Sequence, residues 1–439
     1  MKNFLLFWGL ATSTISIVNG QDRVVTYYPH LPNAIKEVYY ILNEDSTNIN
    51  GQYKMYSPSG KVIALGEFIE GKKEGIFTNY YEDGKVQRTT NFENNLRQGL
   101  TQVFDTAGNV VQEAVFKNDT LIGQLKLYDN EGNLLGETTF NKGKPEGLVK
   151  AFYPNGAIKE EVYYQDGKPN GTTRHFYENG NLKLKADYVN GLLDGNYSTY
   201  YPSGALEMEA LNDRGKRAGF IKYYHENGQI KSEGKYVNGE LSGEFVAFYN
   251  DGSQHKTFKY NNGYRTGKNL EYHQNGKIKY EGNFSNKGMN ARIKEYNERG
   301  NLIVEKQLLN ELPNGEWIFF DDRGRILLSE TYQNGKLHGA RKIYEKGELV
   351  AEENYGFGHK QGVAKTYYSN EKIKTIETWK LDRLEGPFTS FHKNGEKEYE
   401  GKYVRNKRHG EWLFYDKKGN ITSKEQYKAG IIQTKIEDN

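Results

Sequence analysis

The chain has 439 residues, with 60 Lys and Arg against 57 Asp and Glu, and it contains no Cys. Near charge balance provides no basic face for nucleic acid or an anionic membrane, and the lack of Cys excludes disulfides, thiolate metal sites and Cys nucleophiles. Only 36% of the residues are hydrophobic even when the 35 Tyr are counted, which argues against a thick core.

The first twenty residues differ in character from the rest of the chain. Lys2 precedes an apolar run from Phe4 to Val18, and small residues follow up to Gly20. Such a run is too short to span a bilayer and is typical of a secretory signal peptide. We therefore expect cleavage near Gly20 and a periplasmic, cell-surface or extracellular protein. No second apolar stretch follows, so we expect no stable membrane insertion.

Residues 21–50 contain a degraded copy of the pattern that follows. The stretch from Tyr28 to Tyr40 resembles the stretch from Tyr153 to Tyr164, with Tyr-Pro, Asn and Ala-Ile in the same order. Repeat arrays commonly end in atypical units that shield the terminal face. Residues 21–50 are therefore predicted to form a degenerate N-terminal capping repeat.

Residues 51–433 form sixteen tandem repeats, because a marker glycine recurs every 24 residues with one step of 23. Counting the marker as position 0, position 5 is always Tyr or Phe, as in Phe152 and Tyr415. Residues 434–439 are left as a C-terminal tail. The markers are Gly51, Gly75, Gly99, Gly123, Gly147, Gly171, Gly195, Gly219, Gly243, Gly267, Gly315, Gly339, Gly362, Gly386 and Gly410, with Ala291 in the remaining slot.

Two turns per repeat are predicted from turn-forming residues. Around position 9, sequences such as Pro154-Asn155-Gly156 favour a type I turn followed by a glycine bulge, which places position 5 opposite an aliphatic position 11. At position 20, Gly71 and its equivalents alternate with Asn and Asp, which indicates positive φ. A second aromatic column at position 17 is expected on the same face as positions 5 and 11.

These repeats predict an all-β fold, namely an elongated single-layer antiparallel sheet of tandem 24-residue hairpins. An open sheet of that length is expected to be curled or superhelical, because adjacent strands twist. Bulky side chains at position 2, such as Phe77 and Trp412, have the opposite parity to position 5. Either both faces are partly apolar, or a further bulge intervenes.

The segments Tyr280–Phe284, Tyr399–Tyr403 and Arg408–Trp412 resemble the MORN repeat. The long bacterial arrays of its variant form, in the YwqK-like antitoxin family, are the most similar, and the resemblance covers about nine tenths of the chain. It implies a hairpin-repeat fold and a protein-binding, antitoxin-like role.

No constellation in the sequence indicates an enzyme, a cofactor or a metal. Equivalent residues in adjacent repeats are about 9.6 Å apart, so His225 and His273, two repeats apart, cannot share one ion. Glu recurs at position 14, but it does so without a unique member, which favours a solvated charge ladder over a catalytic pair.

Position 6 carries the candidate binding residues. It is Tyr or His in many repeats and is expected on the face opposite position 5. We predict a non-catalytic exported scaffold that binds a protein partner, with binding of a cell-wall glycan by this Tyr/His stripe as the alternative, and no nucleic acid. A plain sheet cover is the competing structural interpretation. The candidate partner-binding residues are Tyr153, Tyr177, Tyr201, His225, Tyr249 and His273.

Overall fold

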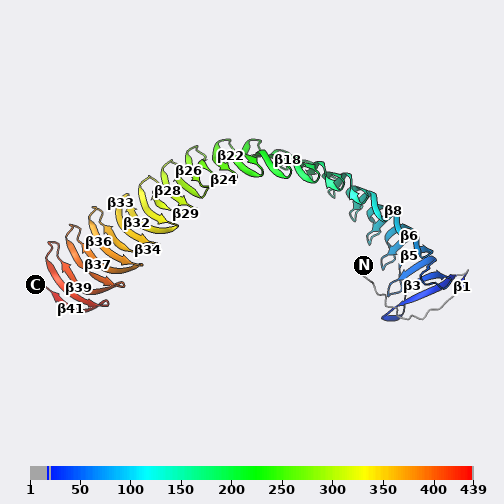
Figure 1. Ribbon diagram of the computed structural model, residues 1–439, viewed down its shortest axis with the longest axis horizontal. Helices are drawn as coiled ribbons and strands as arrows, with labels where there is room; N and C mark the ends of the chain where they lie inside the picture. Colours follow the sequence, from blue (N-terminus) through cyan, green and yellow to red (C-terminus); the bar gives the residue numbers. More distant parts are fainter. Residues whose placement is uncertain (1–16, 19–20, 438–439) are drawn as a thin grey trace. The chain divides into compact units, whose positions relative to one another are not determined.

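The computed structural model describes residues 17–18 and 21–437, and every regular element in this part of the chain is a β-strand. Contacts divide the chain into two units, Met1–Lys216 and Arg217–Asn439. Within each unit, hairpin follows hairpin in a single-layer antiparallel sheet that does not close on itself (Figure 1). The expected single-layer sheet of hairpin repeats is confirmed. Apart from Ile17 and Val18, the predicted signal peptide lies outside the described residues.

The first unit contains the N-terminal hairpin and the first repeats. Its strands are β1 (Ile17–Val18), β2 (Gln21–Tyr28), β3 (Leu31–Leu42), β4 (Gly51–Tyr56), β5 (Val62–Ile69), β6 (Lys72–Tyr80), β7 (Val86–Glu93), β8 (Leu96–Phe104), β9 (Val110–Lys117), β10 (Thr120–Tyr128), β11 (Leu134–Asn141), β12 (Lys144–Pro145), β13 (Gly147–Phe152), β14 (Ile158–Gln165), β15 (Lys168–Pro169), β16 (Gly171–Phe176), β17 (Leu182–Val189), β18 (Leu192–Tyr200) and β19 (Leu206–Asp213).

The second unit continues the same pattern, and its last strand extends into the predicted 434–439 tail. Its strands are β20 (Lys216–Tyr224, which begins at the last residue of the first unit), β21 (Ile230–Val237), β22 (Glu240–Phe248), β23 (Gln254–Asn261), β24 (Tyr264–Arg265), β25 (Gly267–Tyr272), β26 (Ile278–Ser285), β27 (Asn290–Tyr296), β28 (Leu302–Leu309), β29 (Leu312–Pro313), β30 (Gly315–Phe320), β31 (Ile326–Gln333), β32 (Lys336–Glu345), β33 (Glu348–Gly356), β34 (His359–Lys360), β35 (Gly362–Tyr367), β36 (Ile373–Lys380), β37 (Arg383–Phe391), β38 (Lys397–Val404), β39 (Lys407–Tyr415), β40 (Ile421–Lys428) and β41 (Ile431–Glu437).

The turn around position 9 forms as predicted. In the repeat of β13 and β14, the Gly156 N–H donates to the Tyr153 carbonyl at 2.8 Å, and the φ of Gly156 is 81°. Pro154 occupies the second turn position, where its fixed φ suits a type I turn. Phe152 lies directly opposite Ile158, so the expected pairing of positions 5 and 11 is confirmed.

The turn at position 20 is a two-residue hairpin turn. Ile69 pairs with Lys72, and both intervening residues have positive φ, 49° at Glu70 and 76° at Gly71. Two consecutive left-handed residues define a type I′ turn, whose twist matches that of the flanking strands. The sequence indicated the left-handed residue at position 20 but not the one before it.

The marker glycine forms a bulge between successive repeats. Ile122 pairs with Val115 and Leu125 pairs with Ala114, so Gly123 and Gln124 have no partner in the preceding strand. The φ of Gly123 is 63°, a conformation that favours glycine. Ala291 holds the marker slot where the pairing of β26 with β27 runs without a register shift, which explains why a side chain is accepted there.

The expected placement of the position 17 aromatic column is wrong. Ala151 pairs with Glu160 while Phe152 pairs with Ile158, so Lys159 at position 12 is an extra residue in the second strand. This bulge inverts the alternation of faces between positions 11 and 13. Position 17 therefore lies with position 2 on one face, which we call the packed face. Positions 1, 3, 5, 11, 14 and 16 lie on the other, the open face.

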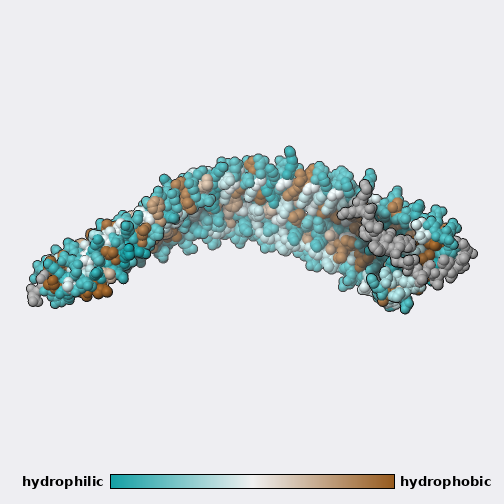
Figure 2. Space-filling model, turned by 60° about the horizontal axis from the view of Figure 1, so that its bottom comes forward, coloured by the Kyte–Doolittle hydropathy of each residue, from teal (hydrophilic) through white to brown (hydrophobic). Residues whose placement is uncertain are grey.

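The packed face provides the core of each repeat. In the first unit, the aromatic rings of Tyr53, Phe68, Phe77 and Phe92 follow one another at centroid separations of 5.5, 5.4 and 5.2 Å with edge-to-face geometry. All buried apolar residues of the repeats lie on this face: Ala64, Phe77, Ala114, Val162, Ala186, Met208, Ala210, Ile221, Ala247, Phe258, Ala291, Ile293, Ala364, Phe388 and Trp412. The surface that Figure 2 shows is mostly hydrophilic, with apolar side chains in small groups.

Small and large residues are matched between neighbouring repeats on the packed face. A Cβ added to Gly66 at position 15 would lie 2.3 Å from the Phe77 ring at position 2 of the next repeat. Gly401 is covered by Trp412 in the same way, again at 2.3 Å. At these two junctions position 15 therefore has no room for a side chain.

Candidate functional site

Position 6, the predicted binding stripe, links each repeat to the next. The Tyr153 hydroxyl donates to the Phe176 carbonyl at 2.8 Å, and Tyr177 donates to the Tyr200 carbonyl at 2.8 Å. Tyr201 holds the same position in its repeat. In these bonds the polar tip of position 6 contacts the backbone at position 5 of the following repeat.

The second unit repeats this arrangement with both Tyr and His. The Tyr249 hydroxyl donates to the Tyr272 carbonyl at 2.7 Å. The Nε2 atom of His225 lies 3.3 Å from the Phe248 carbonyl, and that of His273 lies 2.8 Å from the Tyr296 carbonyl. A tyrosine hydroxyl and an imidazole N–H thus occupy the same donor position, which accounts for the exchange of Tyr and His in this column.

Side chains from the bulged position 12 cover the position 6 rings. The Lys159 Nζ lies 5.8 Å from the centroid of Tyr153, and the Lys183 Nζ lies 5.6 Å from that of Tyr177. His255 stacks on Tyr249 at 4.4 Å. Partner binding by this stripe stays a prediction, since these contacts describe only what the rings do within the chain.

Replacing Tyr153 with Phe is expected to lower the free energy of unfolding by about 1 kcal/mol, because the half-buried Phe176 carbonyl loses its donor while the ring remains. Chemical denaturation of the first unit measures this. Tyr163→Phe is the matched control, since Tyr163 is 46% exposed on the open face. Equal losses in the two variants would contradict the linking role of position 6.

The open face of the first unit carries a row of exposed apolar side chains at positions 1 and 16. Ile76 is 65% exposed and Leu148 is 42% exposed, and Leu148 lies directly opposite Tyr163. We call this row the open-face stripe; its residues are Ile76, Leu100, Leu148, Tyr163 and Leu211. For position 16, sequence reasoning missed it because the bulge at position 12 hid the face on which that position lies.

Equivalent positions in the second unit are mostly polar. Glu244 pairs with Lys259, and Glu411 pairs with Gln426. Phe220 and Val363 are the exposed apolar exceptions. The apolar character of this row is thus concentrated in the first unit, although the backbone pattern of both units is the same.

A charged row at positions 3 and 14 runs beside the open-face stripe. The Lys150 Nζ lies 3.6 Å from Glu137, and the Arg174 guanidinium lies 3.8 Å from Glu161. These pairs are partly exposed and contribute little to stability. Their effect is to present alternating charge next to the apolar row.

The second unit carries a charge network on its packed face. The Arg341 guanidinium donates to Glu330 at 3.0 Å and to Glu353 at 3.1 Å, and the Lys360 Nζ donates to Glu353 at 2.8 Å. Burial raises the pKa of Glu353, but hydrogen bonds from Lys360 and Arg341 outweigh it and hold the pKa below 4.5. Burial and donation to Glu330 raise the pKa of Tyr332 to about 12.

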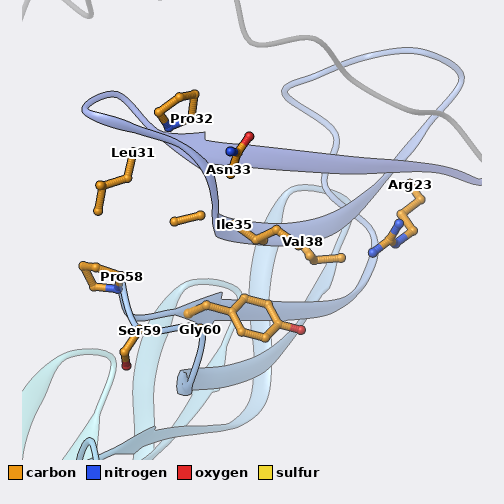
Figure 3. Close-up of a pocket in the computed structure, with 11 residues that line it drawn as sticks. Arg23, Leu31, Pro32, Asn33, Ile35, Val38, Pro58, Ser59 and Gly60 are labelled. Atoms are coloured by element: carbon orange, nitrogen blue, oxygen red, sulfur yellow. The ribbon is translucent and has the colours of Figure 1, made fainter.

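A cavity of about 590 Å³ lies between the N-terminal hairpin and the first repeat (Figure 3). Leu31, Pro32, Ile35 and Val38 come from β3, whereas Pro58 comes from the turn after β4. Arg23, Asn33 and Ser59 add polar groups to the lining. Sequence reasoning indicated only that residues 21–50 contain a degraded copy of the repeat, and it did not predict this cavity.

The described part of the chain contains neither a cluster of metal-ligating side chains nor a helix that could cross a membrane. Over residues 17–18 and 21–437, no group of three or more His, Cys, Asp or Glu side chains is placed to hold a metal ion. In the same residues, no helix has the length and apolar character needed to cross a membrane.

Comparison with protein families identifies the repeats. Eight segments match the MORN repeat variant. They are residues 49–70, 73–94, 145–166, 169–190, 221–238, 265–286, 360–381 and 408–429. Most of these MORN-type segments begin two residues before a marker glycine and therefore coincide with one structural repeat. The MORN resemblance is confirmed for these segments, whereas the finer YwqK-like antitoxin resemblance stays a prediction.

The remaining comparisons add little. No curated protein matches the sequence. A chain in the crystal structure of TcdB2-TccC3-Cdc42 is 11% identical to this chain, with a TM-score of 0.13. The match covers 92% of this chain and 27% of that chain. A chain in the structure of the Photorhabdus luminescens Tc holotoxin pore is 12% identical, with a TM-score of 0.13. That match covers 92% of this chain and 26% of the other chain. This chain thus spans about a quarter of the length of those chains.

Proposed function

We propose that this protein is a non-catalytic scaffold that binds a protein partner along the open-face stripe of its first unit. The observation that carries the proposal is the row of exposed apolar side chains at positions 1 and 16 of four repeats, beside a row of paired charges. Clustered exposed apolar residues with a polar border are typical of protein interaction sites. The apolar run from Phe4 to Val18, predicted to be a signal peptide, supports a location outside the cytoplasm.

The partner surface is expected to match the repeat. Equivalent residues of successive repeats lie about 9.6 Å apart. Ile76 and Leu100 are one repeat apart, whereas Leu100 and Leu148 are two repeats apart, so an extended partner would reach across a polar repeat to contact several members. The charged row at positions 3 and 14 would orient such a partner. Its signs alternate, so a partner displaced along the row would bring like charges together.

A photo-reactive residue placed at Leu148 would first identify the partner by crosslinking, and its affinity would then be measured with purified proteins. Leu148→Ser with Tyr163→Ser is expected to weaken binding at least about tenfold, since losing central contacts costs more than about 1 kcal/mol each. The matched control is Lys268→Ser with Asn283→Ser, a pair at the same positions of the second unit. A loss under threefold in the first variant, with its fold intact, would overturn the proposal.

The glycan alternative is tested separately. If the Tyr/His stripe binds cell-wall polymer, purified cell wall would retain the wild-type protein but not the variant with Tyr153, Tyr177 and Tyr201 replaced by Ser. The open-face variant would be retained normally. Retention of neither the wild type nor the variants would exclude this alternative.

A further inference from the structure

The cavity beside the N-terminal hairpin exists because the stacking of turns is broken there. In regular repeats, adjacent turns are joined by side chains such as Asn179, whose Nδ2 donates to the Pro202 carbonyl at 2.9 Å. The β2–β3 hairpin instead has two register shifts, and Tyr28 pairs with Leu31. The Tyr28 hydroxyl still donates to the Tyr56 carbonyl at 2.7 Å, as position 6 does in the regular repeats. The side-chain bond that joins adjacent turns in those repeats is not formed by the turn between β2 and β3.

Apolar side chains line part of this cavity, and polar groups make up nearly half of its walls. Figure 3 shows Leu31 and Pro58 on opposite walls at one end, with Ile35 and Val38 between this end and Arg23. Its volume of about 590 Å³ is in the range of small-molecule sites. The apolar part of the wall therefore has room for an apolar body of moderate size.

Arg23 gives the cavity its only formal charge among the lining residues. None of those residues is Asp or Glu, and no ion pair joins Arg23 to any other described residue. A guanidinium at the edge of this cavity favours an anion with planar oxygen atoms, above all a carboxylate.

We propose that this cavity binds an amphipathic monocarboxylate, with its apolar part between Leu31, Ile35 and Pro58 and its carboxylate at Arg23. A free aliphatic acid and the carboxyl terminus of a peptide ending in an apolar residue share this chemistry. None of the lining residues belongs to the open-face stripe, so the two proposals can be tested separately.

The test uses calorimetric titration of the full chain with octanoate, with its neutral analogue octanol, and with a short acetylated peptide ending in Leu. Saturable binding of octanoate, clearly tighter than that of octanol, is the expected result. The peptide assigns the source: tighter binding of the peptide than of octanoate indicates a polypeptide terminus, and the reverse indicates a free acid. Equal affinity for octanoate and octanol, or no saturable binding of either acid, would overturn the proposal.

Two variants locate the ligand. Arg23→Gln is expected to weaken acid binding about tenfold or more and to leave octanol unchanged, because only the charge-assisted hydrogen bonds are lost. Leu31→Ser, at an exposed hairpin tip, is expected to weaken both ligands. Arg88→Gln removes an exposed arginine of β7 as the matched control. Unchanged octanoate affinity in both Arg23→Gln and Leu31→Ser would place the ligand elsewhere and refute the site.

Discussion

Replacing Trp412 with Ala is expected to destabilise the C-terminal repeats by about 3–5 kcal/mol, the usual cost of truncating a buried aromatic residue. Trp412 is fully buried at 0% exposure and packs against Tyr403 at 5.1 Å, while the Arg408 guanidinium stacks on it at 4.3 Å. It also covers Gly401, so its removal exposes backbone as well as side chains. Hydrogen exchange of amides in β38, β39 and β40 would report the loss.

The same experiment tests whether stability is local. Because each repeat contacts only its neighbours, amides of β8 and β9 are expected to keep their protection in the Trp412→Ala variant. Trp412→Phe is the control, since a smaller ring retains part of the packing and should cost less. Equal loss of protection in both units would contradict nearest-neighbour stabilisation.

Replacing Arg341 with Leu is expected to cost about 3 kcal/mol at neutral pH, because Glu330 and Glu353 lose their shared cation while remaining largely buried. Glu330 is only 8% exposed, so water cannot replace the guanidinium fully. Urea denaturation of the wild type and the variant measures the difference. Arg292→Leu, at an exposed position of β27, is the control and should have little effect.

The pH dependence of that difference has a definite sign. The pKa of Glu353 in the folded protein lies below 4.5, so its contribution to stability is present above pH 4.5 and is lost as the pH falls through the folded pKa. The gap between wild type and Arg341→Leu should therefore narrow below about pH 4.5. A gap that is constant down to pH 3 would show that packing, and not charge, carries the effect.

The fold was predictable because turn residues and aromatic columns repeat. The pairing of Phe152 with Ile158 follows from the turn at Gly156, and the left-handed Gly71 follows from its exchange with Asn and Asp. The bulge at position 12 was not predictable, since an extra residue needs no particular side chain: Lys159 and His255 both occupy it. This single extra residue places every later side chain of the second strand on the opposite face from the one predicted.

The candidate site was predictable only as a column of residue types. The sequence shows that Tyr153 and His273 share position 6, but their acceptors are backbone carbonyls one repeat away, which leave no trace in composition. The open-face stripe required the correct faces, and the cavity at Arg23 required the register of the N-terminal hairpin. Each depends on pairing geometry that residue types alone do not fix.

The bond from position 6 to the next backbone has a consequence for how such an array changes length. A carbonyl is present whatever residue occupies position 5, so a duplicated or deleted 24-residue unit re-forms the same bond at its new junction. The match between Gly401 and Trp412 is different, because it requires two particular neighbours. Duplication of a repeat is therefore expected to be tolerated where a small side chain at position 15 pairs with a medium-sized side chain at position 2, as Ala114 does with Leu125. It is expected to destabilise the array where a glycine at position 15 lies under a large ring.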